Sequence, residues 1–134
     1  MAEGIEIVDL DIARSRNPDP RKAMYDMYLV LNRVPDKAWS QIFDQEYASV
    51  WHNMKRQAQV REKFIVVHCP PDEIEKYHMP HLRQTVNNTN AKYGAYVIAQ
   101  EQKRIQQQAQ KEAAEQAERD RLEGIKSRLF DTKE

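Results

Sequence analysis

Residues 95–130 read AYVIAQEQKRIQQQAQKEAAEQAERDRLEGIKSRLF, and this stretch decides the overall plan of the chain. It contains no proline and one glycine, Gly124, and up to Glu123 it consists almost wholly of Ala, Gln, Glu, Lys and Arg. These residues are strong helix formers, so the stretch predicts a single long helix. Too few of them are apolar for the helix to lie flat on a core. We therefore expect a projecting helix that meets a protein partner or a second copy of the chain.

The composition indicates one small domain with an extension. The chain has 134 residues, with 21 basic and 21 acidic side chains. This balance argues against a protein that coats nucleic acid or an anionic membrane, because such binding needs net positive charge. The single cysteine, Cys69, permits no internal disulfide, which fits a reducing compartment. No segment resembles a signal peptide or a membrane span, so we expect a cytoplasmic protein without membrane interaction.

Hydrophobic patterns in residues 1–94 predict a small globular domain. Two strands, over 5–12 and 24–34, flank a proline-containing loop and are expected to form a hairpin. Beyond them, apolar residues recur every three or four positions and predict a helix that is capped by Asp36 and runs to about Gln59. The apolar residues of this helix are Trp39, Ile42, Phe43, Tyr47, Val50, Trp51 and Met54.

A third strand and two further helices complete the predicted domain. The strand covers residues 63–69. Asp72 and Glu75 have the spacing of a capping box, which predicts a short helix over 72–78. Pro80 ends this helix and suits the first turn of the next one. One face of that next helix carries Leu82, Val86, Thr89, Tyr93 and Val97.

The order of these elements predicts an α+β fold with two layers. The elements follow the order β-β-α-β-α-α, and the last helix runs past the globular domain of residues 1–94 to form the long polar C-terminal helix of residues 95–134. A β-α-β crossover makes the second and third strands parallel, so the expected sheet is three-stranded and mixed. Helices on one face of that sheet give a two-layer sandwich.

The long helix carries an apolar seam that suits contact with another helix. The seam consists of Ile98, Ile105, Ala109, Ala113, Ala117, Leu122, Ile125 and Leu129. It is not a clean heptad, and small residues of this kind occur where helices approach closely, for instance in antiparallel pairs. Two alternatives are a solvated helix stabilised by its own charge pairs and an apolar end that folds back onto the globular domain. The residues expected to bind a partner are Ile105, Leu122, Ile125, Leu129 and Phe130.

Few side chains in the sequence suit catalysis or metal binding. His68, His78 and His81 lie close to Cys69 and suggest a weak hypothesis, a metal-dependent enzyme. His68 and Cys69 are adjacent in a strand and therefore point to opposite faces. Two prolines after Cys69 supply no backbone N–H group for an oxyanion. We therefore predict a protein that is not an enzyme, with no catalytic residue, bound metal or cofactor.

Two basic clusters favour an alternative function. One cluster flanks the hairpin loop, and the other is expected at the end of the first helix. If both fall at one edge of the domain, they form a modest phosphate-binding patch. The residues are Arg14, Arg16, Arg21 and Lys22 in the first cluster, and Lys55, Arg56, Arg61 and Lys63 in the second.

Two functional hypotheses follow from the sequence. The first is a non-enzymatic interaction module that oligomerises, or docks a protein partner, through its C-terminal helix. The alternative is a small nucleic-acid-associated protein that uses the two basic clusters.

Overall fold

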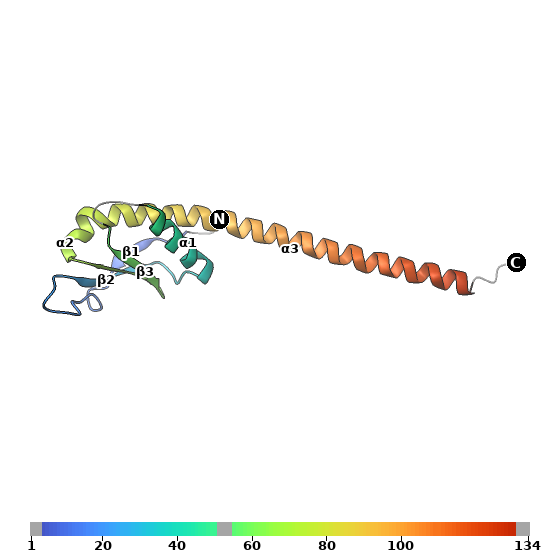
Figure 1. Ribbon diagram of the computed structural model, residues 1–134, viewed down its shortest axis with the longest axis horizontal. Helices are drawn as coiled ribbons and strands as arrows, with labels where there is room; N and C mark the ends of the chain where they lie inside the picture. The colour runs from blue at the N-terminus through green and yellow to red at the C-terminus, as the bar shows by residue number, and fades with distance from the viewer. Residues whose placement is uncertain (1–3, 51–54, 131–134) are drawn as a thin grey trace. The chain divides into compact units, whose positions relative to one another are not determined.

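A computed structural model describes residues 4–50 and 55–130 of the chain (Figure 1). Contacts divide the chain into two compact units, Met1–Gly94 and Ala95–Glu134. The first unit has an α+β architecture with helices on one face of a sheet, as expected. The second unit contains the greater part of a long helix.

The sheet has four strands in the order β1-β2-β4-β3, and every neighbouring pair is antiparallel. The strands are β1 (Ile7–Leu10), β2 (Tyr25–Leu31), β3 (Gln57–Arg61) and β4 (Phe64–Cys69). The hairpin expected between the first two strands is present. The central strand β4 is buried on both faces at residues 64–67, because helices cover one face and the loop between β1 and β2 reaches over the other.

The expected three-stranded mixed sheet is wrong in both strand number and strand direction. Helix α1 (Lys37–Ser49) ends ten residues before Gln59, and the strand β3 follows it. A tight turn at Glu62, whose φ is 52°, leads from β3 directly into β4. Strand β4 therefore lies between β2 and β3 and is antiparallel to both. The alternation in QAQVR is weak as a signal, because only Ala58 and Val60 are apolar.

Helix α1 begins where the sequence predicts, at the N-cap Asp36. The Asp36 carboxylate accepts a hydrogen bond from the Trp39 backbone N–H at 2.8 Å. Trp39, Phe43 and Tyr47 are buried, and their rings stack in sequence with centroid distances of 5.6 and 5.9 Å. These aromatic rings belong to one hydrophobic core with residues of β2, β4 and α3. Two further residues expected on this helix, Trp51 and Met54, lie outside the described residues.

The helical part of the chain runs without the expected break at Pro80. Helix α2 (Pro71–Glu73) leads into the π-helix η1 (Ile74–His78), which leads into α3 (Met79–Phe130). The Met79 N–H bonds the Ile74 carbonyl, a spacing of five residues. This π-turn lies directly before Pro80, which has no N–H to donate, so the helix passes the proline without ending. The N-cap is Pro70 with no side-chain cap bond, so the expected capping box is also wrong.

Asn90 joins three elements of the first unit. Its side-chain oxygen accepts hydrogen bonds from the Ile5 N–H at 3.0 Å and from the Trp39 indole N–H at 2.9 Å. Its amide nitrogen donates to the Ile5 carbonyl at 2.8 Å. Asn90 therefore connects α3 to α1 and to the backbone just before the edge strand β1. The backbone passes so close that a Cβ on Gly4 would lie 2.7 Å from the Asn90 amide nitrogen.

Candidate functional site

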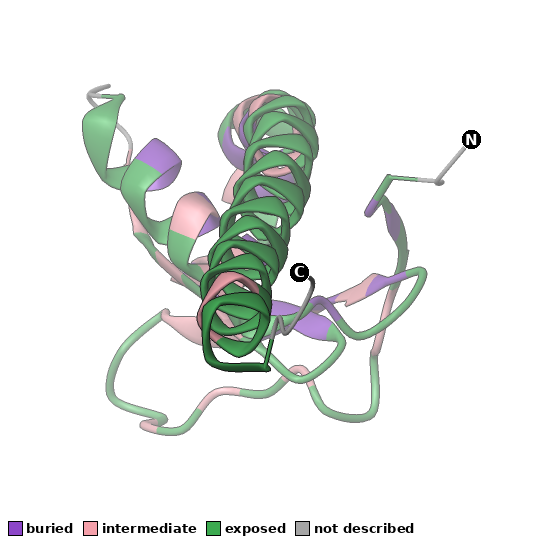
Figure 2. Cartoon of the chain, turned by 90° about the vertical axis from the view of Figure 1, so that its right-hand side faces the viewer, coloured by how far each residue is buried: buried purple, intermediate pink, exposed green. Residues whose placement is uncertain are grey.

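From Ala95 onward, α3 exposes most of its side chains, as the green colour of the helix in Figure 2 shows. Gly124 and Ile125 are half-buried, and the remaining residues up to Phe130 are exposed. Four of the five residues expected to bind a partner are exposed: Ile105 is 54% exposed, Leu122 53%, Leu129 68% and Phe130 72%, and the fifth, Ile125, is half-buried. Covering apolar side chains of this size with a partner is favourable by roughly 1.5–3 kcal/mol for each one fully buried.

The five expected partner-binding residues do not share one face of a straight helix. Successive residues turn by about 100°, so Leu122, Ile125 and Leu129, spaced by three and four, form one stripe. Ile105 and Phe130 lie on another side, about 100° and about 80° around the helix from Leu122. The stripe of three residues is therefore the most compact apolar feature of this helix.

The alanine seam expected along one side of the tail is interrupted. Ala109, Ala113 and Ala117 follow at intervals of four and drift by about 40° at each step. The next apolar residue, Leu122, comes five positions later and lies about 140° from Ala117. The alanines and the terminal stripe are thus separate features.

Polar side chains stabilise this helix locally. Arg104 pairs with Glu101 at 2.5 Å, and Arg121 pairs with Glu118 at 3.1 Å. The hydrogen bond from Arg104 lowers the pKa of the Glu101 carboxyl. Each exposed pair of this kind contributes only a few tenths of a kcal/mol, yet their succession favours the helical state along the whole segment.

Gly94, at the boundary between the two units, is not required for close packing. A Cβ at this position meets no atom within 4 Å, and the glycine does not have a positive φ. Alanine is favoured over glycine in a helix by about 1 kcal/mol.

We expect Gly94→Ala to stabilise the helix at this boundary. The predicted gain of about 0.5–1 kcal/mol slows amide hydrogen exchange around residue 94 by up to about fivefold. Ala99→Gly, five positions further along the exposed helix, is the matched control and is expected to speed exchange. Faster exchange in Gly94→Ala would show that the glycine has a structural role in the helix.

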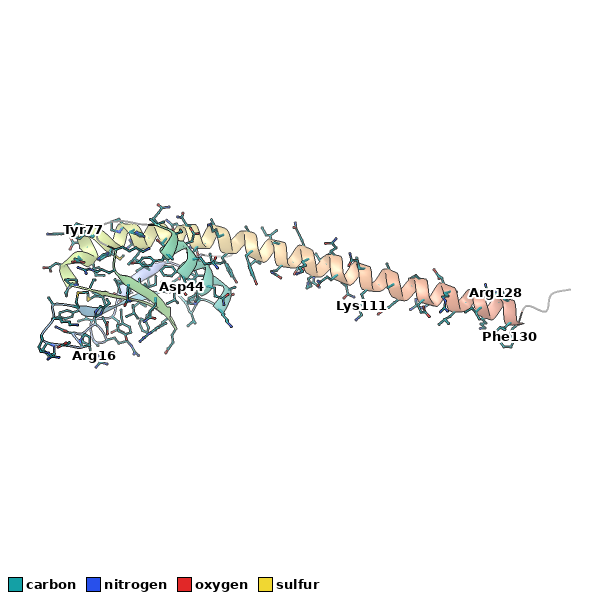
Figure 3. All side chains as sticks on the ribbon, in the orientation of Figure 1. Arg16, Asp44, Tyr77, Lys111, Arg128 and Phe130 are labelled. Carbon is teal, nitrogen blue, oxygen red and sulfur yellow. The ribbon has the colours of Figure 1, made fainter. Side chains whose placement is uncertain are left out.

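The basic residues of the hairpin loop are partly neutralised within the globular unit. Arg14 pairs with Asp11 at 3.3 Å and lies over the ring of Phe64, 5.1 Å from its centroid. Arg21 pairs with Asp19 at 3.2 Å. The other two expected residues, Arg16 and Lys22, are exposed, and Figure 3 shows the Arg16 side chain at the loop.

The second basic cluster does not lie at a helix end. Lys55 and Arg56 precede β3, and Arg61 is the last residue of that strand. Arg56 forms a two-pronged bond with Glu73, with both N···O distances at 3.0 Å. Lys55 lies over the ring of Tyr47 at 4.8 Å from its centroid. Lys63 follows in the turn after β3 and lies over the Phe64 ring, on which Arg14 also packs.

The three histidines of the metal hypothesis contact different groups among the described residues. His68 contacts Asp26 at 2.8 Å, and the buried His78 contacts Glu73 at 3.0 Å. His81 meets the Tyr47 ring edge-on, with 5.4 Å between ring centroids. Within residues 4–50 and 55–130, no group of three or more His, Cys, Asp or Glu side chains is placed to hold a metal ion.

Cys69 lies inside the core of the first unit. Its side chain is fully buried, whereas His68 beside it is half-exposed, as their places on opposite faces of β4 predict. Burial raises the pKa of the Cys69 thiol to about 11. The thiolate needed for nucleophilic attack or metal binding is therefore disfavoured, and Cys69 acts as a small apolar residue.

A hollow of about 690 Å³ opens beside the end of α1. Its described lining includes the Asp26–His68 pair, Lys55, Arg56 and Gln57. A histidine held by a carboxylate is suited to proton transfer. However, the described lining residues include no Ser, Thr or Cys side chain that this pair would activate.

Comparisons with known proteins assign the chain to no family. No family model matches it, and neither a curated protein nor a solved structure shows significant similarity. Across the described ranges, no helix combines the length and apolarity needed to cross a membrane. The class that the structure defines is an α+β protein with a long C-terminal helix.

Proposed function

We propose that this chain is a non-enzymatic interaction module whose C-terminal helix binds another protein helix. The observation that supports this function best is the stripe of Leu122, Ile125 and Leu129 at the end of the mostly polar segment that follows Ile105. A helix that serves only as a solvated extension has no use for large apolar residues in its last turns. A stripe with spacings of three and four is the pattern by which one helix packs against another.

The energetics fit a reversible contact. Covering the stripe together with Ile105 contributes several kcal/mol of apolar burial, by the usual relation between buried area and free energy. Loss of translational freedom and side-chain ordering oppose association by several kcal/mol. An interface confined to one helix of this kind is therefore expected to depend on every large apolar side chain in it.

The nucleic-acid alternative has weaker support in the contacts. Three of its candidate residues, Arg14, Arg21 and Arg56, already pair with carboxylates of the globular unit. Phosphate binding would have to replace these pairs in a chain of zero net charge.

We expect the double variant Leu122→Gln/Leu129→Gln to lose binding while the globular unit stays folded. A photo-crosslinking amino acid at Arg128, an exposed position in the last turn, reports contacts of the full chain inside cells. Adducts are expected to fall at least tenfold in the double variant. Lys111→Gln changes an exposed residue outside the stripe and serves as the matched control, with adducts retained.

Truncation after Gly94 tests the same proposal in a second way. The buried residues of α3, Leu82, Thr85, Val86 and Thr89, all precede the cut, so we expect cooperative thermal unfolding to persist. A crosslinker in the globular unit is then expected to yield no adducts. The proposed function is wrong if the stripe variant keeps its adducts or if the truncated chain binds as the full chain does.

A further inference from the structure

We infer that the helix bound by the tail is the same helix of a second copy, paired in antiparallel orientation. This inference rests on the proposed function and specifies its partner. In this pairing, Ile98 lies opposite Leu129 of the second copy, and Ile105 lies opposite Leu122. The two-fold axis then passes between Ala113 and Ala114, so both copies use the same surface.

Supercoiling brings the separated apolar residues into one seam. A straight helix drifts by about 20° for each heptad relative to a repeat of 3.5 residues, and two paired helices remove this drift by under-winding. Ile98 and Ile105 are one heptad apart, and so are Leu122 and Leu129. In heptad terms the first pair occupies position a and the second occupies position d, which together form the core of a coiled coil.

Charges along this seam disfavour the parallel orientation. In a parallel pair, each core residue faces its own copy, so like charges meet at every charged layer. The layers concerned are those of Glu101, Glu112, Glu115, Arg119 and Lys126. The sequence holds no compensating group within those layers, so parallel pairing brings five repulsive contacts into the seam.

The antiparallel orientation turns most of these layers into attractive ones. Residues equally distant from the axis face each other, so Glu101 lies opposite Lys126 of the second copy. Gln108 lies opposite Arg119 and can accept its hydrogen bond. Only Glu112 and Glu115 face a like charge, and Glu112 already accepts a hydrogen bond from Gln108 on its own helix at 3.0 Å.

Positions that flank the seam add a further pair. Lys111 and Glu118 both occupy position g, and g residues face one another across an antiparallel pair. Lys111 lies two and a half positions from the axis and Glu118 lies four and a half positions from it on the other side. Across the pair, Lys111 of one copy and Glu118 of the other are therefore offset by two residues, about 3 Å along the helix, a distance that these long side chains span. Figure 3 shows the Lys111 side chain standing off the helix, and both residues are exposed. The symmetry therefore gives two such ion pairs in one dimer.

The register is fixed by the four large apolar residues. Shifting the helices by one heptad places Leu129 opposite Ile105 but leaves Leu122 opposite Glu112. Shifting them the other way places Leu122 opposite Ile98 but leaves Ile105 opposite Glu115. Only the proposed register pairs all four with one another, and apolar burial is the dominant favourable term in association.

Engineered cysteines test orientation and register together. We expect Ile105→Cys and Leu122→Cys variants to form a disulfide with each other when mixed, and neither to form one alone. Two copies of residue 105 are separated by about 25 Å along an antiparallel pair, too far for a bridge. Cys69 is buried, so the native chain is the negative control. A bridge between identical positions would establish a parallel pair and overturn the inference, while leaving the proposed function in place.

Charge reversal tests the same register without cysteine chemistry. Lys126→Glu is expected to weaken the dimer about tenfold, because two attractive pairs become repulsive, and adding Glu101→Lys is expected to restore it. Lys103→Glu makes the same change in net charge at an exposed position away from the seam, so it is the matched control. Light scattering supplies the dissociation constants. A monomeric full chain overturns the inference. The proposed function still holds in that case if the crosslinked adducts at position 128 contain another protein, and it is wrong if they contain none.

Discussion

Replacing Asn90 with alanine is expected to lower the free energy of unfolding of the globular unit by about 3 kcal/mol. The substitution removes one side chain but leaves three groups without a partner: the Ile5 N–H, the Ile5 carbonyl and the Trp39 indole N–H. Trp39 is buried, so its indole N–H has little access to water as a replacement. An unsatisfied buried donor or acceptor costs about 1–3 kcal/mol, which makes the loss larger than that of a single hydrogen bond.

Asn87→Ala is the matched control, because Asn87 lies on the same helix and is exposed. Alanine is the better helix former, so this variant is expected to be neutral or slightly more stable. Urea unfolding followed by tryptophan fluorescence measures both variants. Equal stability of the two would show that Asn90 does not hold α3 to α1 and the N-terminal segment. A broader loss of structure at residues 5–10 in Asn90→Ala, seen by hydrogen exchange, would locate the effect.

Replacing Glu73 with glutamine is expected to destabilise the globular unit at neutral pH and to flatten its acid unfolding. The Arg56 guanidinium, through hydrogen bonds, lowers the pKa of Glu73 from 4.5 to about 2, with His78 contributing a further hydrogen bond. A carboxyl with a lowered pKa stabilises the folded state above its unfolded pKa and loses this effect as the pH falls. Allowing for solvent around Arg56, the contribution is about 2 kcal/mol at neutral pH.

The contribution of Glu73 can be measured from the way the free energy of unfolding changes with pH. Stability of the native chain is expected to fall as the pH drops from about 4.5 towards about 2. Glu73→Gln removes this part of the slope, whereas Glu75→Gln, an exposed neighbour, is expected to retain it. Denaturant unfolding at several pH values between 2 and 7 gives both slopes. Parallel pH profiles for the native chain and Glu73→Gln would contradict the assignment.

Local signals in the sequence predicted several elements correctly. Asp36 was identifiable as an N-cap because Ser, Thr, Asp and Asn favour that position. The aromatic residues Trp39, Phe43 and Tyr47 were expected on a buried face from their spacing, and they are buried. A strand was predicted over residues 63–69, and β4 covers Phe64–Cys69. Each of these signals depends on neighbours within one or two turns of the chain, which is the range that sequence periodicity covers.

Strand β3, which was not predicted from the sequence, is determined by a non-local contact and not by a local signal. Its partner is the next strand, β4, and its identity depends on that pairing rather than on its own composition. Gln57, Gln59 and Arg61 point away from the helices, and Ala58 and Val60 bury only part of their surface. Such a segment has low intrinsic preference for a strand and continues the helical pattern before it equally well. The hydrogen-bonding partner decides its conformation.

The candidate interaction surface could largely be predicted from the sequence, whereas the polar contacts within the globular unit could not. Leu122, Ile125 and Leu129 are spaced for one helix face, so their place on one stripe of a helix follows from composition and spacing. The pairing of Arg56 with Glu73 depends on β3 lying beside the start of α2. No spacing rule links these two residues, because the chain between them forms two strands of a sheet.

The sequence by itself determined the helical tail, the hydrophobic face of α1 and the division between an apolar globular region and a polar helix. Helix propensity and periodicity are local properties, so they act before any tertiary contact forms. Only the tertiary structure decided the strand count, the antiparallel order of the sheet and the role of Asn90. Asn90 lies 85 positions from Ile5, and hydrogen bonds over that separation exist only after the intervening strands and helices have packed together.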